Sequence, residues 1–410
     1  MSIFTLHGQG LKLDTRADIE PHLATLDPTT LEEIHLGGNT LGVEACEALG
    51  EVLAKCTNIK IADFADIFTG RLISEIPLCL AAILTPLIPH PHLHTLNLSD
   101  NAFGGRSVDP ITPILSQSSS LSTLLLNNNG LGPAGGSEIA FALLRRAQTA
   151  KQEGKPSKLR KVVCGRNRLE DGSAPKWAEA FKEHGGLVEV RMPQNGIRMD
   201  GIVKLAEGLG ACPDLEVLDL QDNTFGVEGD KAFSEALPKL PKLKFLNFSD
   251  CVLSLEDSNE EPPKTIEALA EGSNPKLETL QLQNNNLTGD SIRLLADSVG
   301  EKLTGLKFLE VQWNEVEEDE EGVQTLADNL RTRGGKFVIT DEDEEEEEPS
   351  IIEEAEAEEA AEPVEVEGKA PPPGLEPKEE KAKEETKEKG MLDKATDALA
   401  DLMSKVSIGN

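Results

Sequence analysis

The chain is poor in the side chains that usually anchor large binding surfaces. Its 410 residues include no Tyr, two Trp and 12 Phe, so aromatic residues make up only 3% of the sequence. Interfaces that spread over a broad face depend on a few large aromatic anchors. The composition therefore disfavours a protein that binds its partner through the whole of one face.

Basic charge is also scarce. Lys and Arg number 40 against 74 Asp and Glu, which gives a net charge of −34. Nucleic acids are bound chiefly through cationic contacts to phosphates, so we expect no nucleic-acid partner, whereas a basic protein surface suits this charge. Residues 341–410 hold 25 acidic and 8 basic side chains, so half of the net charge, −17, lies in that segment.

Several functional classes lack their motifs in this sequence. There is no phosphate-binding glycine loop and no GxSxG, HExxH or CxxC motif, so we expect no catalytic centre of those classes and no cofactor. The six Cys show no pairing pattern, which is typical of reduced core residues. Neither an apolar leader nor a run of about 20 apolar residues is present, so we expect neither secretion nor membrane insertion.

One cluster resembles a metal site. His90, His92 and His94 alternate along the chain, and an extended backbone would place their three imidazoles on one side. No Cys or carboxylate stands nearby in the sequence to complete a zinc site. We therefore interpret these residues as ordinary surface histidines of a loop that leads into a strand near Leu93, and we expect no metal.

Repetition is what the sequence has in abundance. The pattern LxxLxLxxNxL is plainest in residues 215–225 and 277–287, and it is the signature of leucine-rich repeats. Weaker copies occupy residues 4–11 and 59–64, and Ile67 takes the polar position of the second of these. From one repeat to the next, this position advances by 28 to 38 residues. The polar position is filled by Asn39, Asn101, Asn129, Asn167, Asn195, Asn223, Cys251, Asn285 and Asn314.

Each repeat predicts one strand and one helix. The LxL core is long enough for a single short strand, and the polar Asn can satisfy backbone groups where the chain leaves that strand. Residues 43–53 and 201–209 have apolar side chains at helical spacing. We expect an α/β leucine-rich repeat solenoid over residues 1–340: a horseshoe of about eleven strand-helix units with a parallel sheet on the concave face.

The composition changes after the repeats. Residues 341–348 are eight consecutive acidic side chains, followed by sequence rich in Glu, Ala, Pro and Lys. Such sequence cannot bury a core, so residues 341–390 are predicted to be an acidic disordered tail. Residues 391–407 carry apolar side chains at helical spacing, which predicts one short amphipathic helix.

Polar side chains that the repeat pattern does not require follow several strands. Arg71, Asn128 and Arg166 each stand at or just beyond the end of a predicted strand. Because the carboxyl ends of parallel strands meet at one edge of the sheet, we expect these residues to share one rim of the horseshoe. Solvated turn residues are ordinary at such positions, but their recurrence over nearby repeats favours a binding surface.

At these positions the chain resembles the Ran GTPase-activating proteins, and more closely their fungal type. The resemblance spans the repeats, and the FADIFTGR stretch is the most specific part because it breaks the leucine-rich pattern. The acidic run that follows the repeats is also typical of the family. The matching stretches are residues 64–71 (FADIFTGR), 98–104 (LSDNAFG), 128–133 (NNGLGP), 164–170 (CGRNRLE) and 194–198 (QNGIR).

The resemblance implies an activator that acts in trans on the GTP-bound form of the small GTPase Ran and is not itself an enzyme. Asn128 would orient the catalytic glutamine of Ran, and Arg71 would support that contact without serving as an arginine finger. Further implied partner contacts are Asp66, Asp100, Asn101, Arg166 and Arg168. The resemblance also implies a role in nucleocytoplasmic transport in the cytoplasm, including the cytoplasmic face of the nuclear envelope, and we expect a monomer.

Two other functional classes remain open from the sequence. One is a non-catalytic leucine-rich repeat scaffold or inhibitor of the ribonuclease-inhibitor type, which the shortage of aromatic anchors disfavours. The other is an acidic histone-chaperone-like protein, in which the FADIFTGR stretch has no role.

Overall fold

The computed structural model describes residues 2–254, 261–317 and 321–340. These residues belong to one compact unit. The predicted acidic tail and the predicted helix at 391–407 lie outside the described residues, so both remain predictions.

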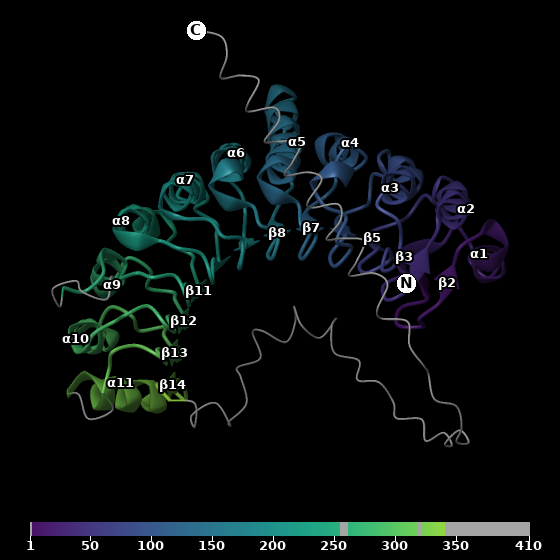
Figure 1. The fold of residues 1–410 in the computed structure, drawn as a ribbon. Coiled ribbons are helices and arrows are strands. Elements are labelled where there is room, and N and C mark those ends of the chain that lie inside the picture. The colour runs from purple at the N-terminus through teal and green to yellow at the C-terminus, as the bar shows by residue number, and fades with distance from the viewer. Residues whose placement is uncertain (1, 255–260, 318–320, 341–410) are drawn as a thin grey trace, which may run out of the picture. The chain divides into compact units, whose positions relative to one another are not determined.

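Short parallel strands form the inner layer of the repeat body (Figure 1). Within the described residues the main sheet has twelve strands in the order of the chain, apart from β2 (Lys12–Leu13) and β4 (Thr40–Leu41), which pair separately. The main strands are β1 (Ser2–Thr5), β3 (Leu31–His35), β5 (Ile61–Asp63), β6 (Thr95–Asn97), β7 (Thr123–Leu125), β8 (Lys161–Val163), β9 (Glu189–Arg191), β10 (Val217–Asp219), β11 (Phe245–Asn247), β12 (Thr279–Gln281), β13 (Phe308–Glu310) and β14 (Lys336–Val338).

Helices cover the outer side of this sheet (Figure 1). Short 3₁₀ segments supplement them at η1 (Thr85–Leu87), η2 (Gly105–Ser107) and η3 (Leu237–Lys239). The α-helices are α1 (Arg16–Leu23), α2 (Val43–Leu53), α3 (Ile76–Leu84), α4 (Thr112–Gln117), α5 (Gly132–Gln152), α6 (Glu170–His184), α7 (Met199–Leu209), α8 (Gly226–Ala236), α9 (Lys264–Ala270), α10 (Gly289–Val299) and α11 (Glu321–Thr332).

The predicted solenoid is confirmed, with one strand more than the predicted number of repeats. The described part contains eleven α-helices, and β14 follows the last of them and pairs with β13. The helix predicted at residues 43–53 is α2 with the same bounds. None of the described helices combines the length and the apolar character that crossing a membrane requires.

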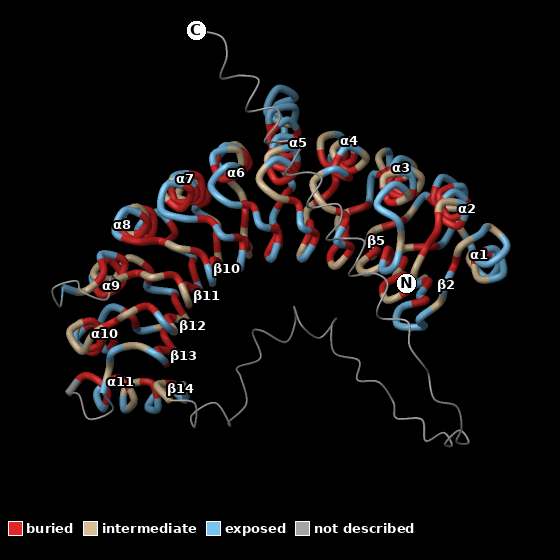
Figure 2. Tube along the Cα trace, viewed as in Figure 1, coloured by how far each residue is buried: buried red, intermediate tan, exposed pale blue. Residues whose placement is uncertain are grey.

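The core runs between the two layers along the whole repeat body (Figure 2). The middle residues of successive strands stand in register and are fully buried, as with Leu96, Leu124, Val162 and Val190. Each such side chain contributes about 1.5–3 kcal/mol on burial. Because a repeat on its own leaves these side chains exposed, the repeats are stable only when stacked.

The repeated Asn residues form a buried ladder at the ends of the strands. Asn129 is fully buried, and its Nδ2 donates to Leu98 O and Leu126 O, both at 3.0 Å. Its Oδ1 accepts the backbone N–H of Asn101 at 3.0 Å. Cys251 replaces Asn in this role by donating from Sγ to Leu220 O at 3.3 Å. The predicted satisfaction of turn backbone groups by this position is therefore confirmed.

The cysteines are buried as the sequence predicts, whereas the interpretation of the three histidines as surface residues is wrong for His90. All six cysteines are free and buried, and burial raises the pKa of Cys164 to about 12, so its thiol is protonated at neutral pH. His90 is buried, with Nε2 3.1 Å from Leu53 O. His94 Nδ1 lies 2.9 Å from Thr95 Oγ1, and His92 is exposed. The three imidazoles thus have separate surroundings.

Candidate functional site at the carboxyl edge of the sheet

One row of residues stands immediately before the ladder position in consecutive repeats. We call it the turn row, and its members after β5, β6, β7 and β8 are Asp66, Asp100, Asn128 and Arg166. Their φ angles are 45°, 60°, 53° and 55°, which is the left-handed region that Asn and Asp tolerate better than most residues. This conformation ends the strand at the same place in each repeat, so the row follows the edge of the sheet.

The turn row continues the hydrogen bonding of the sheet. The backbone N–H of Asp100 donates to Asn127 O at 2.9 Å, and that of Asn128 donates to Gly165 O at 3.0 Å. Neighbouring members are therefore held about one strand spacing apart, roughly 5 Å. The backbone of the row is fixed by the fold, and only its side chains are free to meet a partner.

Asn128 is the exposed amide of this row. Its Nδ2 donates to Asp100 Oδ1 at 3.0 Å, while Asp100 is half-buried. Asn129, the next residue, is buried in the ladder. Adjacent asparagines thus have opposite environments, as the sequence analysis predicted.

Asn101 has little capacity for a partner. It is 3% exposed, its Nδ2 donates to Phe64 O and Leu98 O, both at 2.9 Å, and its Oδ1 accepts the N–H of Ile67. Both ends of its amide are engaged in the ladder. The structure therefore gives the Asn101 side chain a supporting place beneath the turn row instead of the contact surface predicted from the sequence.

Arg71 lies five residues beyond Asp66 and turns back toward the preceding repeats. Its Nη2 is 2.6 Å from Asp14 Oδ1, and its Nε donates to Thr40 Oγ1 at 2.9 Å. Nη2 also donates to Thr40 O at 3.1 Å, and the Arg71 side chain is only 10% exposed. The adjacent Arg71 guanidinium is the main reason why the pKa of Asp14 lies below its usual value. Arg71 is thus at the predicted edge but held in place by intramolecular contacts.

A groove of about 560 Å³ opens beside Arg71. Lys12, Asp14, Thr40, Thr69 and Glu75 contribute polar groups to its lining. The exposed side chain of Leu72 also borders it. The groove gives a partner access to the solvent-exposed part of the Arg71 guanidinium.

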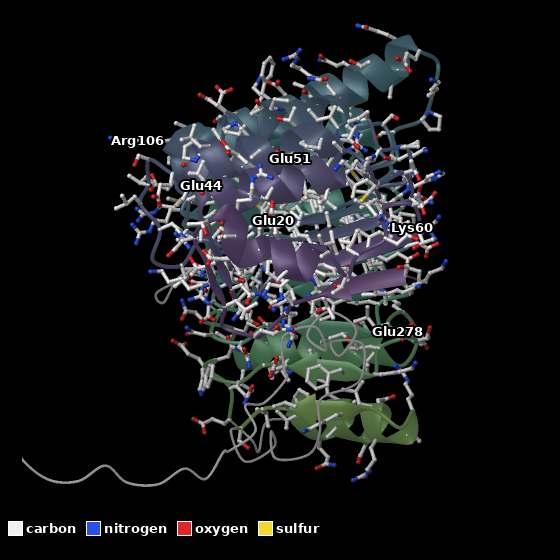
Figure 3. All side chains as sticks on the ribbon, turned by 90° about the vertical axis from the view of Figure 1, so that its right-hand side faces the viewer. Glu20, Glu44, Glu51, Lys60, Arg106 and Glu278 are labelled. Atoms are coloured by element: carbon white, nitrogen blue, oxygen red, sulfur yellow. The ribbon has the colours of Figure 1, made fainter. Side chains whose placement is uncertain are left out.

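Two further arginines at this edge, unlike Arg71, form no ion pair within the described part of the chain, whereas cations at the opposite edge are paired. Arg166 and Arg168 are exposed and form no ion pair with any described residue. In the loops that enter the strands, Lys60 pairs with Glu32 at 3.0 Å and Lys307 pairs with Glu278 at 3.2 Å. Figure 3 shows the two edges, with Glu44 and Arg106 on one side and Lys60 and Glu278 on the other.

Two features of the site were not predicted from the sequence. Asp14 and Thr40 hold Arg71, and exposed Arg106 stands on η2, which packs against the start of α5. Glycine permits the close packing of η2 against α5, because a Cβ on Gly105 would lie 2.5 Å from Leu131 O. The glycine pair at 104–105 in the sequence is the available signal for that approach.

Comparison with known proteins agrees with this architecture. The leucine-rich repeat family model, described as "Leucine Rich repeat", matches residues 27–50, 90–111, 211–234 and 273–296. "Ran GTPase-activating protein 1" of Saccharomyces cerevisiae is 37% identical over 334 residues, which cover 79% of this chain and 81% of the yeast protein. The chain belongs to the Ran GTPase-activating protein family. This membership confirms the resemblance that the FADIFTGR stretch indicated.

Animal members of the family share a shorter segment. "Ran GTPase-activating protein 1" of Xenopus laevis is 41% identical over 194 residues, covering 46% of this chain and 33% of the frog protein. "Ran GTPase-activating protein" of Drosophila melanogaster is 40% identical over 211 residues, covering 50% of this chain and 35% of the fly protein. The chain therefore matches about a third of each of these longer relatives.

Proposed function

We propose that this chain accelerates GTP hydrolysis by Ran in its GTP-bound form, and that Asn128 does so by orienting the catalytic glutamine of the GTPase. Membership of the family supports Ran as the partner. The observation that carries the mechanism is the exposed Asn128 amide on a rigid turn row, at the edge where Arg71 is already held by Asp14.

An amide suits this task because it donates and accepts hydrogen bonds at once, as a glutamine side chain does. Activators of GTPases either insert an arginine finger or order the water-positioning glutamine. Asn128 adds no charge to the transition state, so the rate gain comes from positioning and from exclusion of water. Arg71 supports binding from the groove, which is lined by residues of the repeats that precede Asn128.

The remaining parts of the proposal concern partner contacts and setting. Asp66, Asp100, Arg166 and Arg168 offer charges of both signs around Asn128, and Asn101 supports them through the ladder. The acidic chain favours encounter with a basic face of Ran. We further propose that the protein acts as a monomer in the cytoplasm, including the cytoplasmic face of the nuclear envelope, and supports nucleocytoplasmic transport.

The direct test is single-turnover hydrolysis of GTP by GTP-loaded Ran, measured with and without this protein. We expect a large acceleration that saturates with the protein concentration. An unchanged rate at saturating concentration would overturn the proposal and leave a non-catalytic scaffold as the better hypothesis.

Asp14→Asn is expected to weaken activation because it releases Arg71. The variant keeps the shape of the side chain but removes the charge that pairs with the guanidinium at 2.6 Å. Since the pKa of Asp14 is lowered, its carboxyl stays charged to a pH below the usual Asp pKa near 4, so the pair with Arg71 is intact at neutral pH. Hydrolysis rates at pH 7 check this prediction, and Asp214→Asn, at a surface pair with Lys242, is the control.

Deletion of residues 341–410 is expected to slow association with Ran more than it lowers the maximal rate. This segment holds half of the net charge, which attracts a basic partner over a long range. The deficit should shrink with salt, since the screening length falls to about 3 Å at 1 M. Association rates measured at several salt concentrations test this; a truncated protein that is inactive at every salt concentration contradicts it.

A further inference from the structure

The contact between Asn128 and Asp100 fixes more than the position of the Asn128 side chain. A carboxylate can only accept hydrogen bonds, so the amide nitrogen of Asn128 must face Asp100 and its Oδ1 must face away. A primary amide has two nearly isosteric orientations, and a charged partner selects one of them. The Asn128 amide is thereby oriented before any partner arrives.

We infer that Asp100 is a positioning residue that orients the Asn128 amide for the incoming glutamine of the GTPase. With one N–H given to Asp100, Asn128 retains its carbonyl oxygen and one N–H for the partner. These two groups match the donor and the acceptor of a glutamine amide. This inference rests on the proposed function. It gives Asp100 a role that acts through Asn128, in addition to the charge that Asp100 offers to the partner.

Asp100 is itself well placed to hold this orientation. Its backbone N–H is bound to Asn127 O at 2.9 Å, and its side chain is half-buried. The neighbouring Asp66 does not compete for Asn128, because its Oδ1 accepts the hydroxyl of Thr69 at 2.6 Å. The carboxylate of Asp100 is thus committed to Asn128.

The same pair recurs far from the site, which shows that the turn row forms it without a partner. Asn284 Nδ2 donates to Asp250 Oδ1 at 2.8 Å, and both residues have left-handed backbones with φ of 50° and 55°. This second pair stands five turn-row steps from the first toward the carboxyl terminus, from Asn128 to Asn284. Asp250 and Asn284 therefore provide matched controls for backbone strain and for loss of the hydrogen bond.

The test compares single-turnover GTP hydrolysis by GTP-loaded Ran at saturating concentrations of Asp100→Ala, Asp100→Asn and Asp250→Ala. We expect Asp100→Ala to lower the maximal rate about tenfold, the scale of a lost charge-assisted hydrogen bond, with a smaller change in affinity. Asp100→Asn keeps an acceptor and should recover most of that loss. Asp250→Ala should match the wild-type rate. Asp100→Gly, which removes any strain at positive φ, should behave as Asp100→Ala does.

A double-mutant comparison separates positioning from direct contact. In the Asn128→Ala background, Asp100→Ala should have no further effect on the maximal rate, because the amide that it orients is gone. If Asp100→Asn loses as much of the maximal rate as Asp100→Ala, or if the two losses add, Asp100 affects the rate independently of Asn128 and the inference is wrong. A wild-type chain that fails to accelerate hydrolysis overturns the proposed function instead, and this inference with it.

Discussion

Asn128→Ala is expected to lower the maximal rate of stimulated GTP hydrolysis by Ran about 100-fold, the scale on which misplacement of a reacting group by about 1 Å acts. Affinity for GTP-loaded Ran should change little, because one exposed amide contributes a small part of a charged interface. The loss should appear at saturating concentrations in single-turnover measurements. A fully active Asn128→Ala protein ends the proposed mechanism.

Two controls show whether the effect belongs to the site. Asn284→Ala removes the equivalent hydrogen bond from a residue with the same backbone conformation and should leave the rate unchanged. Asn128→Gly also removes the amide but relieves the positive φ of 53°, and it should be as inactive as Asn128→Ala. Melting temperatures of the three variants should stay close to that of the wild type.

Asn129→Ala should lower the stability of the protein and leave the maximal rate nearly unchanged, the opposite of Asn128→Ala. Leu98 O and Leu126 O keep the amides of Asn101 and Asn167 as donors, but the buried N–H of Asn101 loses its acceptor. One unsatisfied buried group costs about 1–3 kcal/mol of unfolding free energy. We expect a lower melting temperature and, at temperatures where the variant is folded, a nearly normal maximal rate. Equal stability of Asn129→Ala and Asn128→Ala would contradict the division between ladder and site.

The fold can be predicted from the sequence because the same strand, turn and helix pattern recurs in each repeat. A position such as Asn129 appears at fixed offsets from its leucines, so one physical explanation covers every copy. The length of helix α5 could not be predicted in this way. The helix has 21 residues within a repeat of 38, and the repeat pattern alone does not set that length.

Side-chain partners across repeats were harder to predict. Asp100 stands 28 residues before Asn128, and only the left-handed turn at both positions brings their side chains together. Asp14 and Arg71 are 57 residues apart, and their pairing depends on the chain after β5 folding back over β2 and β4. The pattern places each residue within its own repeat, whereas these contacts depend on stacking and on irregular turns.

Arg71→Ala is expected to lower both affinity for GTP-loaded Ran and the stimulated rate. The side chain is 10% exposed and is held by Asp14 and Thr40, so its removal opens the groove and leaves Lys12 as the ion-pair partner of Asp14. Loss of a charge-assisted contact to the partner corresponds to about tenfold weaker binding. Equilibrium affinity and single-turnover rates measured on the same samples test whether the two fall together.

Arg71→Lys distinguishes this role from that of an arginine finger. Lys keeps the charge but cannot reproduce the contacts that Nε makes with Thr40 Oγ1 and Nη2 makes with Thr40 O. If Arg71 supports binding from the edge, Arg71→Lys should retain part of both affinity and rate, and Asp14→Asn should resemble it. A finger requires its guanidinium at one point in the transition state, so Arg71→Lys would then bind normally and have almost no activity. Because Arg71 is bound to Asp14 and Thr40 before Ran arrives, we expect the first result.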